Sequence, residues 1–399
     1  MKKAYTEQEL KALFGQNLTE SDLINQKIQE AYTLIRETAP KRKPLGKFGI
    51  TMTGVAAALV LGIIFCAANP VLAARIPIIG RIFQIEEEKV SYPGDYSAKA
   101  QKLITPEESA VPDKEAQSPK ESPYRQTSNG ITFSISECYA DSMAMYLAVS
   151  LEAENGFPQT FLEVNEGWDL SYQILEMNTT ACADFGSSVP GKLYFDPAQG
   201  VVSPYFIEGN FLDSGSFAGI IRISLADMAG LDASGSLQKP ATLPEHFTYE
   251  LNISDFYVVK PETLSYSNDP ATLETVSGDW SFSIDVTVDN SEVVTKELNL
   301  TNDSGIGIRS VRKSPYEITA DLLLPEDENA GEYVIVMADS AGERLDYRGN
   351  TVGTYSTYKR DTGKVTLAVC EESVFLEYKG DFDTLLSKAV FKTEVDFSK

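Results

Sequence analysis

The side chains that could perform chemistry in this sequence include few imidazoles and thiols. His246 is the only histidine, and the four cysteines are Cys66, Cys138, Cys182 and Cys370. These residues do not supply the ligand sets of the common zinc sites, and a relay that needs two histidines is excluded. We expect His246 to be a surface histidine and Cys138 a packed thiol. We predict no metal and no cofactor, and whether Cys138 and Cys182 pair stays open.

Carboxylates are abundant, but their spacing matches no known site. The acidic runs at 86–88, 326–328 and 381–383 are typical of solvated faces or turns, and no calcium-binding loop of the D-x-[DN]-x-[DN]-G type is present. Phosphate-binding, dinucleotide-binding and nucleophile-elbow motifs are absent as well. We therefore predict that the protein is not an enzyme. An exterior hydrolase would require a cleft of converging carboxylates.

The charge of the chain is acidic and unevenly distributed. Lys and Arg number 34 against 58 Asp and Glu, which gives a net charge of −24. Residues 1–68 carry nine basic and six acidic side chains, so residues 69–399 carry 25 and 52, a net charge of −27. Because phosphate backbones are bound by clustered cations, nucleic acid is excluded as a partner.

Residues 48–68 form an uncharged apolar run of 21 residues. At about 1.5 Å per residue, a helix of this length spans a hydrocarbon core of about 30 Å. Basic residues precede the run and an acidic run follows it, so the positive-inside rule places residues 1–47 in the cytoplasm and the C-terminal domains outside the cell. A cleaved signal peptide is the competing interpretation, but its apolar region is shorter and lies nearer the N-terminus. We predict a single-pass protein of the cell membrane, in contact with membrane lipid.

The cytoplasmic segment 1–47 contains one amphipathic helix pattern. Thr19 and Asp22 resemble a capping box, and Pro40 ends the helix. Its apolar face is formed by Ile24, Ile28, Ala31 and Ile35. This stripe is too short to form a core alone, so it packs against another copy, a cytosolic partner or a preceding helix at 7–14.

The juxtamembrane element 69–90 is apolar but too short and broken to span a membrane again. Residues 69–83 read NPVLAARIPIIGRIF and are interrupted by Pro70, Pro77 and Gly80. We expect an interfacial or domain-docking element with buried side chains at Ile76, Ile78, Ile79, Ile82 and Phe83. Residues 91–128, rich in proline and polar side chains, predict a hydrophilic stalk.

From residue 129 onwards the apolar period becomes two. Ile131, Phe133 and Ile135 alternate with polar residues, and similar runs follow at 145–152, 170–175, 221–225 and 247–254. We predict an immunoglobulin-like antiparallel β-sandwich over 129–260, then a linker at 261–278. The alternating strand 280–289 is assigned to a second sandwich at 279–399, with further strands at 293–300, 316–324, 333–337 and 364–369. The predicted fold is mainly β, with a short cytoplasmic helix, one transmembrane helix and two extracellular domains.

These segments resemble bacterial single-span membrane proteins with domain of unknown function 4179. In that family, an Asn-Pro-x-x-Ala element and an Ile-Pro-x-x-Gly-x-Ile-Phe motif follow the span, and an NGI…YxD strand pair opens the exterior domain. The matching residues are Asn69, Pro70, Ala73, Ile76, Pro77, Gly80, Ile82, Phe83, Asn129, Gly130, Ile131, Tyr139 and Asp141. The C-terminal part, which opens with GDWSFSIDV at 278–286, looks like the companion domain of unknown function 5643.

The resemblance implies a regulatory function and names no catalytic residues. Such proteins are often described as anti-sigma factors or envelope sensors. The zinc anti-sigma module carries a His and paired Cys, which residues 1–47 lack, so binding of a cytosolic sigma factor would rest on the apolar stripe. Our hypothesis is a membrane signalling protein with an unknown envelope ligand. The alternative is an anchored envelope binding or structural module with no regulatory role.

Overall fold

The computed structural model describes only part of the chain. The described residues are 82–83, 90, 94, 96–104, 122–164, 172–196, 198, 203–226, 228–259, 273–346 and 353–398. The predicted helix stripe (Ile24, Ile28, Ala31, Ile35), the predicted span 48–68 and the motif residues Asn69, Pro70, Ile76, Pro77 and Gly80 lie outside them. Within the described ranges, none of the helices has the length and apolar character needed to cross a bilayer.

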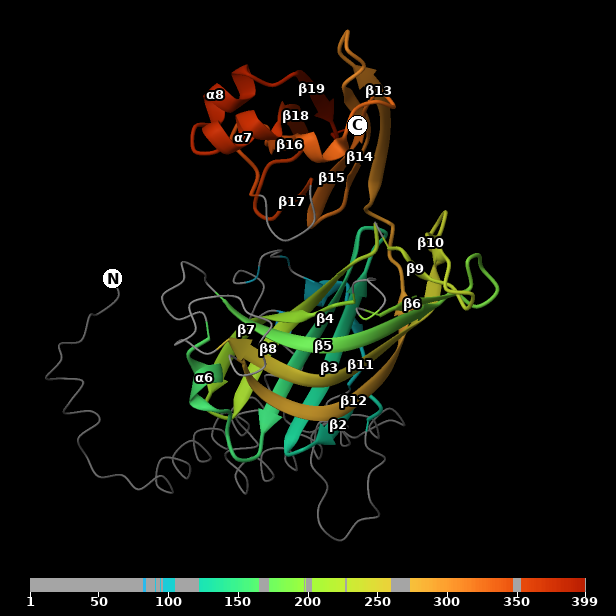
Figure 1. Cartoon of the computed structure of the whole chain (residues 1–399), viewed down its shortest axis with the longest axis vertical. Coiled ribbons are helices and arrows are strands. Elements are labelled where there is room, and N and C mark those ends of the chain that lie inside the picture. The colour runs from blue at the N-terminus through green and yellow to red at the C-terminus, as the bar shows by residue number, and fades with distance from the viewer. Residues whose placement is uncertain are drawn as a thin grey trace, which may run out of the picture. The chain divides into compact units, whose positions relative to one another are not determined.

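The first domain is built on one antiparallel sheet of 12 strands (Figure 1). The strands are β1 (Gln101–Lys102), β2 (Arg125–Ser128), β3 (Ile131–Ala140), β4 (Ala144–Ala153), β5 (Gln173–Asp184), β6 (Lys192–Phe195), β7 (Phe206–Asp213), β8 (Ser216–Ser224), β9 (Gly230–Leu231), β10 (Leu237–Gln238), β11 (His246–Val259) and β12 (Leu273–Thr287). Their order is β1-β3-β4-β8-β7-β5-β6-β9-β10, while β2 also pairs with β3, and β11 pairs with both β5 and β12. Two short helices accompany them, η1 (Tyr96–Ala98) and α6 (Gln159–Leu162).

The sheet curls until β12 meets β2, and side chains complete that contact. The Gln126 side chain accepts a hydrogen bond from the Ser281 N–H (2.8 Å) and donates one to the Ser281 carbonyl. Ser128 Oγ accepts from the Asp279 N–H (2.9 Å), and Asn129 Nδ2 donates to the Ser277 carbonyl (3.0 Å). The polar side chains of β2 therefore satisfy backbone groups of β12 that would otherwise lie on an open edge.

The core of the first domain follows from the alternation in β11 and β12. Trp280, Phe282, Ile284 and Val286 are buried, while the residues between them are exposed. Trp280 packs on Phe256 with ring centroids 5.1 Å apart, and its Nε1 donates to the Ile131 carbonyl (3.1 Å). The indole thus joins β12 to the strand pair that opens the domain.

The position of β12 corrects two expectations. We assigned this strand to the second domain, after a linker at 261–278, but it pairs with β11 from His246↔Thr287 to Val259↔Leu273. Residues 273–278 are therefore strand, and the sheet of the first domain extends to residue 287. Alternation identifies the buried face of a strand but not its partner, which is why the polar segment before it resembled a linker between domains. The expected pair of separate sheets is likewise replaced by one continuous sheet.

The second domain contains two antiparallel sheets, β13-β14-β15-β17 and β16-β18-β19. The strands are β13 (Val294–Thr301), β14 (Gly307–Lys313), β15 (Glu317–Leu323), β16 (Tyr333–Ala338), β17 (Thr354–Ser356), β18 (Lys364–Glu371) and β19 (Phe391–Asp396). Both sheets contribute to one core, with Ile308 and Ile318 from the first and Leu367 and Val369 from the second. Four strands lie where the alternation predicts them, whereas β14, β17 and β19 were not predicted.

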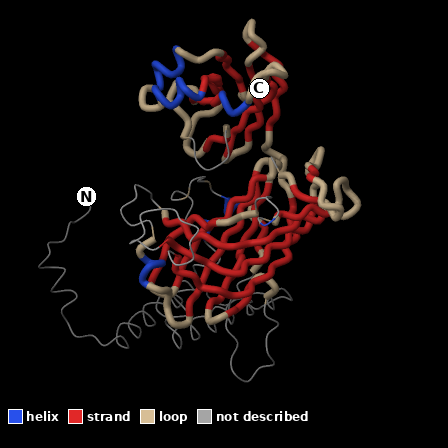
Figure 2. The backbone as a smooth tube through the Cα atoms, in the orientation of Figure 1, coloured by secondary structure: helices blue, strands red, loops and turns tan. Residues whose placement is uncertain are grey.

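Three helices of the second domain were also not predicted (Figure 2). They are η4 (Ala330–Glu332), α7 (Glu372–Tyr378) and α8 (Phe382–Ser387). Leu385 of α8 packs with Val336, Ala368 and Cys370 of the second sheet, and partly buried side chains of α7 join this cluster. The helices therefore cover the face of that sheet opposite the main core.

The predicted stalk at 91–128 is in part folded. Tyr96, Leu103 and Ile104 are buried, and the Leu103 N–H donates to the Ser136 carbonyl (2.9 Å). Prolines and charged residues dominate the composition of this segment and favoured a solvated stalk, although its few apolar residues are buried. Residues 105–121 lie outside the described ranges.

We expect Trp280→Ala to destabilise the first domain and leave the second domain unaffected. Truncating a buried Trp costs about 3–5 kcal/mol, and the Ile131 carbonyl also loses its donor. Hydrogen exchange of the full chain should show faster exchange at amides of β3 and β11, and unchanged exchange at β16 and β18. Leu367→Ala is the matched change in the second core and should give the reverse pattern. Faster exchange in β16 and β18 alone after Trp280→Ala would contradict the reassignment of β12.

Candidate functional site

A row of polar side chains crosses three strands on the outer face of the first sheet. Tyr139 of β3 lies opposite Tyr146 of β4, and Tyr146 lies opposite Arg222 of β8. Residues opposite each other in register share a face, so these three side chains lie side by side. Small residues on the same face, including Ala144, Ala148 and Ala218, leave room for other parts of the chain to pack there.

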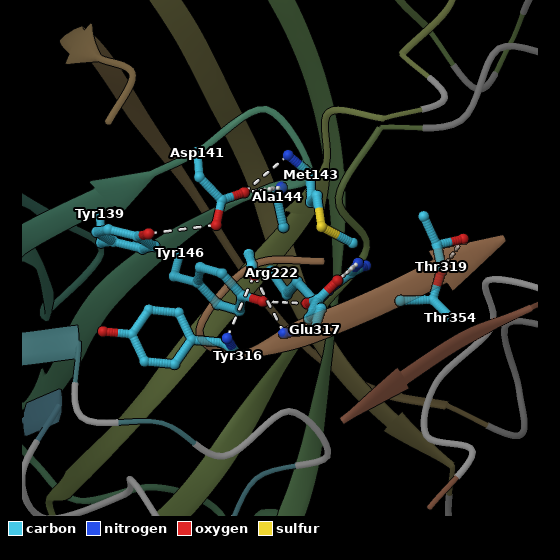
Figure 3. A network of polar contacts seen from close by, with 11 residues as sticks. Tyr139, Asp141, Met143, Ala144, Tyr146, Arg222, Tyr316, Glu317, Thr319 and Thr354 are labelled. Atoms are coloured by element: carbon cyan, nitrogen blue, oxygen red, sulfur yellow. Dashed lines mark hydrogen bonds and ion pairs between the residues drawn. The ribbon is translucent and has the colours of Figure 1, made fainter. Parts of the chain in front are cut away.

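Glu317 of the second domain binds this row (Figure 3). Its Oε1 accepts from Arg222 Nε at 2.6 Å, and its Oε2 accepts from an Arg222 terminal nitrogen at 2.7 Å. The Tyr146 hydroxyl donates to the same Oε1. The Glu317 side chain is 1% exposed and that of Arg222 15%. A bidentate guanidinium–carboxylate pair in such a place is strongly orientation-specific.

The turn between β14 and β15 holds Glu317 in position. Ser314 Oγ accepts from the N–H groups of Tyr316 (3.2 Å) and Glu317 (3.1 Å), and the Ser314 N–H donates to the Glu317 carbonyl (2.8 Å). Thr357 Oγ1 donates to the Pro315 carbonyl (2.8 Å). These hydrogen bonds hold the backbone of the turn from both sides and do not involve Arg222.

Asp141 closes the β3–β4 hairpin beside the row. Its Oδ1 accepts from the N–H groups of Met143 (2.7 Å) and Ala144 (3.0 Å), and its Oδ2 accepts from the Tyr139 hydroxyl (3.2 Å). Burial raises the pKa of Asp141 to about 6, to which the negative charge of Glu317 contributes, although the two backbone hydrogen bonds lower it. Asp141 therefore titrates well above the usual range of an aspartate.

The described residues of the segment that precedes β1 pack on the same row. Tyr96 lies 4.2 Å from Tyr146 and 4.4 Å from Tyr316, measured between ring centroids. Phe83 lies 5.2 Å from Tyr96, and Ile82 and Phe83 are both completely buried in this cluster. Two residues of the juxtamembrane motif are thus brought together with Tyr139 and Asp141.

Gly94 shows how closely this segment approaches the second domain. A Cβ added at Gly94 would lie 2.4 Å from Cδ1 of Tyr316, and 3.0 Å from Cζ of Tyr96. No side chain fits at such distances, so glycine is required here by space. We name the whole cluster of Ile82, Phe83, Gly94, Tyr96, Tyr139, Asp141, Tyr146, Arg222, Tyr316 and Glu317 the junction.

The groups of the junction can form hydrogen bonds and ion pairs that hold parts of the chain together. Burial and the charge of Glu317 raise the pKa values of Tyr96 and Tyr146 well above the ordinary tyrosine value. Both phenols therefore stay protonated, so Tyr146 acts as a hydrogen-bond donor rather than a base. The junction joins residues that precede β1, the first sheet and the second domain through one ion pair, phenol hydroxyls and packed rings.

The remaining candidate residues are not members of the junction, and Cys138, the neighbour of Tyr139 in β3, belongs to the core of the first domain. His246 is exposed, with Nδ1 3.2 Å from Thr287 Oγ1. Cys138, Cys182 and Cys370 are free thiols and all are buried. Burial raises the pKa of Cys138 to about 12, which keeps the thiol protonated.

An acidic pocket lies in the second domain. Glu328, Glu332, Glu371 and Glu372 line it with Tyr333, whose hydroxyl donates to Glu328 (2.8 Å). In the described part of the chain, no three His, Cys, Asp or Glu side chains are placed to hold a metal ion.

Sequence reasoning did not identify Tyr146, Arg222, Tyr316 or Glu317 as site residues. One signal was present in the sequence, because Arg222 is the only charged residue in the strand SFAGIIRIS and lies between Ile221 and Ile223. Since Ile221 and Ile223 face the core, Arg222 has to face outward. Nothing in the sequence around Glu317 shows that it is the partner.

Asp141→Asn should remove a pH dependence of stability. The native pKa lies above the ordinary value of 3.8, so the native state retains a proton that the unfolded chain releases. The resulting stability is present below pH 4 and is lost as the pH rises through 6. At about 1.4 kcal/mol per pKa unit, the free energy of unfolding of the wild type should fall by about 3 kcal/mol relative to the variant between pH 4 and pH 7. Urea unfolding at several pH values measures this difference.

Asp232→Asn provides the control of opposite sign. Asp232 is exposed, and hydrogen bonds from Ser234 and Ser236 lower its pKa. Relative to this variant, the wild type should gain stability as the pH rises. If Asp141→Asn and the wild type show parallel pH profiles, the pKa of Asp141 is the same in the folded and unfolded states, which contradicts the prediction.

Residues 47–153 match the model of a family described as a domain of unknown function (DUF4179). No curated protein matches the chain. Among solved structures, the chain is similar to the crystal structure of a conserved domain protein from Bacillus anthracis, with 11% sequence identity and a TM-score of 0.36 over 70% of this chain and 80% of that one. The family match confirms the first of the two resemblances, and its range includes the Ile82–Phe83 and Tyr139–Asp141 parts of the junction.

Proposed function

We propose that this protein is a single-pass membrane signalling protein, an envelope sensor or anti-sigma-factor-like regulator, whose exterior β-domains act on a cytoplasmic segment. The observation that supports this function is the complete burial of Ile82 and Phe83 in the junction. Ile82 follows the end of the predicted span at residue 68 by only 14 positions, and Phe83 is the next residue. A structural change at the junction therefore acts on the polypeptide next to the membrane.

The proposed switch has a docked and an undocked state, and the burial of Ile82 and Phe83 sets the free-energy difference between them. Fully burying a side chain such as Ile or Phe contributes about 1.5–3 kcal/mol, so undocking Ile82 and Phe83 together costs several kcal/mol. A ligand of the exterior domains shifts that equilibrium only as far as it binds the two states differently. The envelope ligand proposed here is one that prefers the undocked or the docked arrangement.

The cytoplasmic output is assigned to the stripe Ile24, Ile28, Ala31 and Ile35. Because residues 1–47 contain no histidine or cysteine, a sigma factor would bind this apolar face without zinc. We also propose that the C-terminal domain is a domain of the kind described as domain of unknown function 5643.

Ile28→Asp should abolish this output in the full-length membrane protein. A charge in the middle of the stripe opposes burial against a partner. We expect the amount of sigma factor that co-purifies with the protein to fall at least tenfold relative to the wild type, and transcript levels to change. Gln26→Asp places the same charge on the opposite face of the predicted helix and should preserve both. If transcription is the same in the wild type, in Ile28→Asp and after deletion of residues 2–35, the protein is an anchored module without regulatory output.

A further inference from the structure

We propose that the Tyr316–Glu317 turn of the second domain is a latch that holds Gly94 and residues 96–104, called the segment below, on the first sheet. Its biological meaning rests on the proposed signalling function. The latch itself is a property of the exterior part of the chain and is measured separately.

The latch contacts the segment directly through Tyr316. The Tyr316 ring lies 4.4 Å from the Tyr96 ring and occupies the space that a Gly94 side chain would need. Tyr139 also packs edge-on against Tyr316 at 5.2 Å. Tyr96 therefore lies between the sheet and the second domain, and it loses a packing partner if Tyr316 withdraws.

Tyr146 connects the latch to the segment a second time. Its hydroxyl donates to Glu317, while its ring stacks on Tyr96 at 4.2 Å. One side chain therefore serves both the ion pair that seats the second domain and the ring that seats the segment. Loss of either neighbour changes the environment of the other.

The ion pair makes the latch specific without making it permanent. Arg222 binds both oxygens of Glu317, so only one placement of the turn satisfies the carboxylate. In the separated state, water hydrates both charges, which offsets much of the attraction lost. A nearby surface pair, Lys99–Glu292 at 2.7 Å, is more exposed, with the Glu292 side chain 57% accessible, and contributes little.

The first test is hydrogen exchange of the full chain in detergent micelles after Glu317→Gln. The variant keeps the shape of residue 317 but removes its charge, so the ion pair between Arg222 and residue 317 is lost. We expect amides of 96–104, such as the Ala100 N–H bonded to the Tyr96 carbonyl, to exchange at least tenfold faster. Amides of β11 and β12 should not change. Glu343→Gln removes an ion pair with Arg360 within the same domain and should leave 96–104 at the wild-type rate. Unchanged exchange of 96–104 in Glu317→Gln would overturn the latch.

The second test changes a residue beside Tyr96 instead of Glu317. It tests the coupling even if Glu317→Gln unfolds the second domain. Gly94→Val adds bulk against Tyr316 without altering any group of the ion pair. Because coupling between two sites is reciprocal, amides of the latch turn, including the Glu317 N–H bonded to Ser314, should then exchange faster. Amides of β16 and β18 should keep their rates. Faster exchange in the segment with an unaffected turn would disprove the coupling.

The outcomes separate the latch from the signalling function. Reciprocal exchange in both variants without any effect of Glu317→Gln on transcription would support the latch and refute its role in signalling. A transcriptional effect without coupling in exchange would refute the latch alone.

Discussion

The buried carboxylate of Glu317 is the group that the arrangement around it has to satisfy. An unpaired charge out of water costs several kcal/mol, so the second domain docks only where a guanidinium and a phenol already lie together. Arg222 and Tyr146 meet that need because β8 and β4 pair in one register. A slip of one residue would turn Arg222 toward the core and leave Glu317 without its partner. The register of the first sheet and the position of the second domain are thus linked through one ion pair.

The tyrosines that donate hydrogen bonds to the buried carboxylates also pack against one another. Tyr139 and Tyr146 each donate a hydroxyl to a carboxylate, Asp141 and Glu317 respectively, while their rings face Tyr96. The rings keep water away from the carboxylates, which is the main reason that the pKa of Asp141 rises. Aromatic burial and charge neutralisation therefore depend on each other, and the buried residues Ile82, Phe83 and Tyr96 belong to the same cluster.

Local pattern predicted the strands of this protein better than their partners. The alternation around Trp280 gave a strand with the correct buried face, but the return of that strand to β11 depends on contacts distant in the sequence. The helices α7 and α8 were not predicted because they lack a clear apolar stripe: α7 contains no buried residue, and Leu385 is the only buried residue of α8. A short signal for α8 did exist, since Asp381 accepts from the Thr384 N–H as a helix cap. For the site, the family motif identified Ile82, Phe83, Tyr139 and Asp141, whereas Glu317 is tertiary information that the surrounding residues do not carry.

The chain reaches and leaves the first domain at neighbouring points. Lys99, before the first long strand, forms an ion pair with Glu292, which follows the last one, and Tyr96 packs on Tyr316 close by. A pulling force between residue 82 and the second domain would consequently run straight through these few contacts. While these contacts hold, the twelve-stranded hydrogen-bonded ladder bears little of the load, although the chain itself passes through every strand from β1 to β12. Under tension the junction would separate first, and only then would the load reach the strands at the two ends of the sheet, so the smallest interface is the first mechanical barrier.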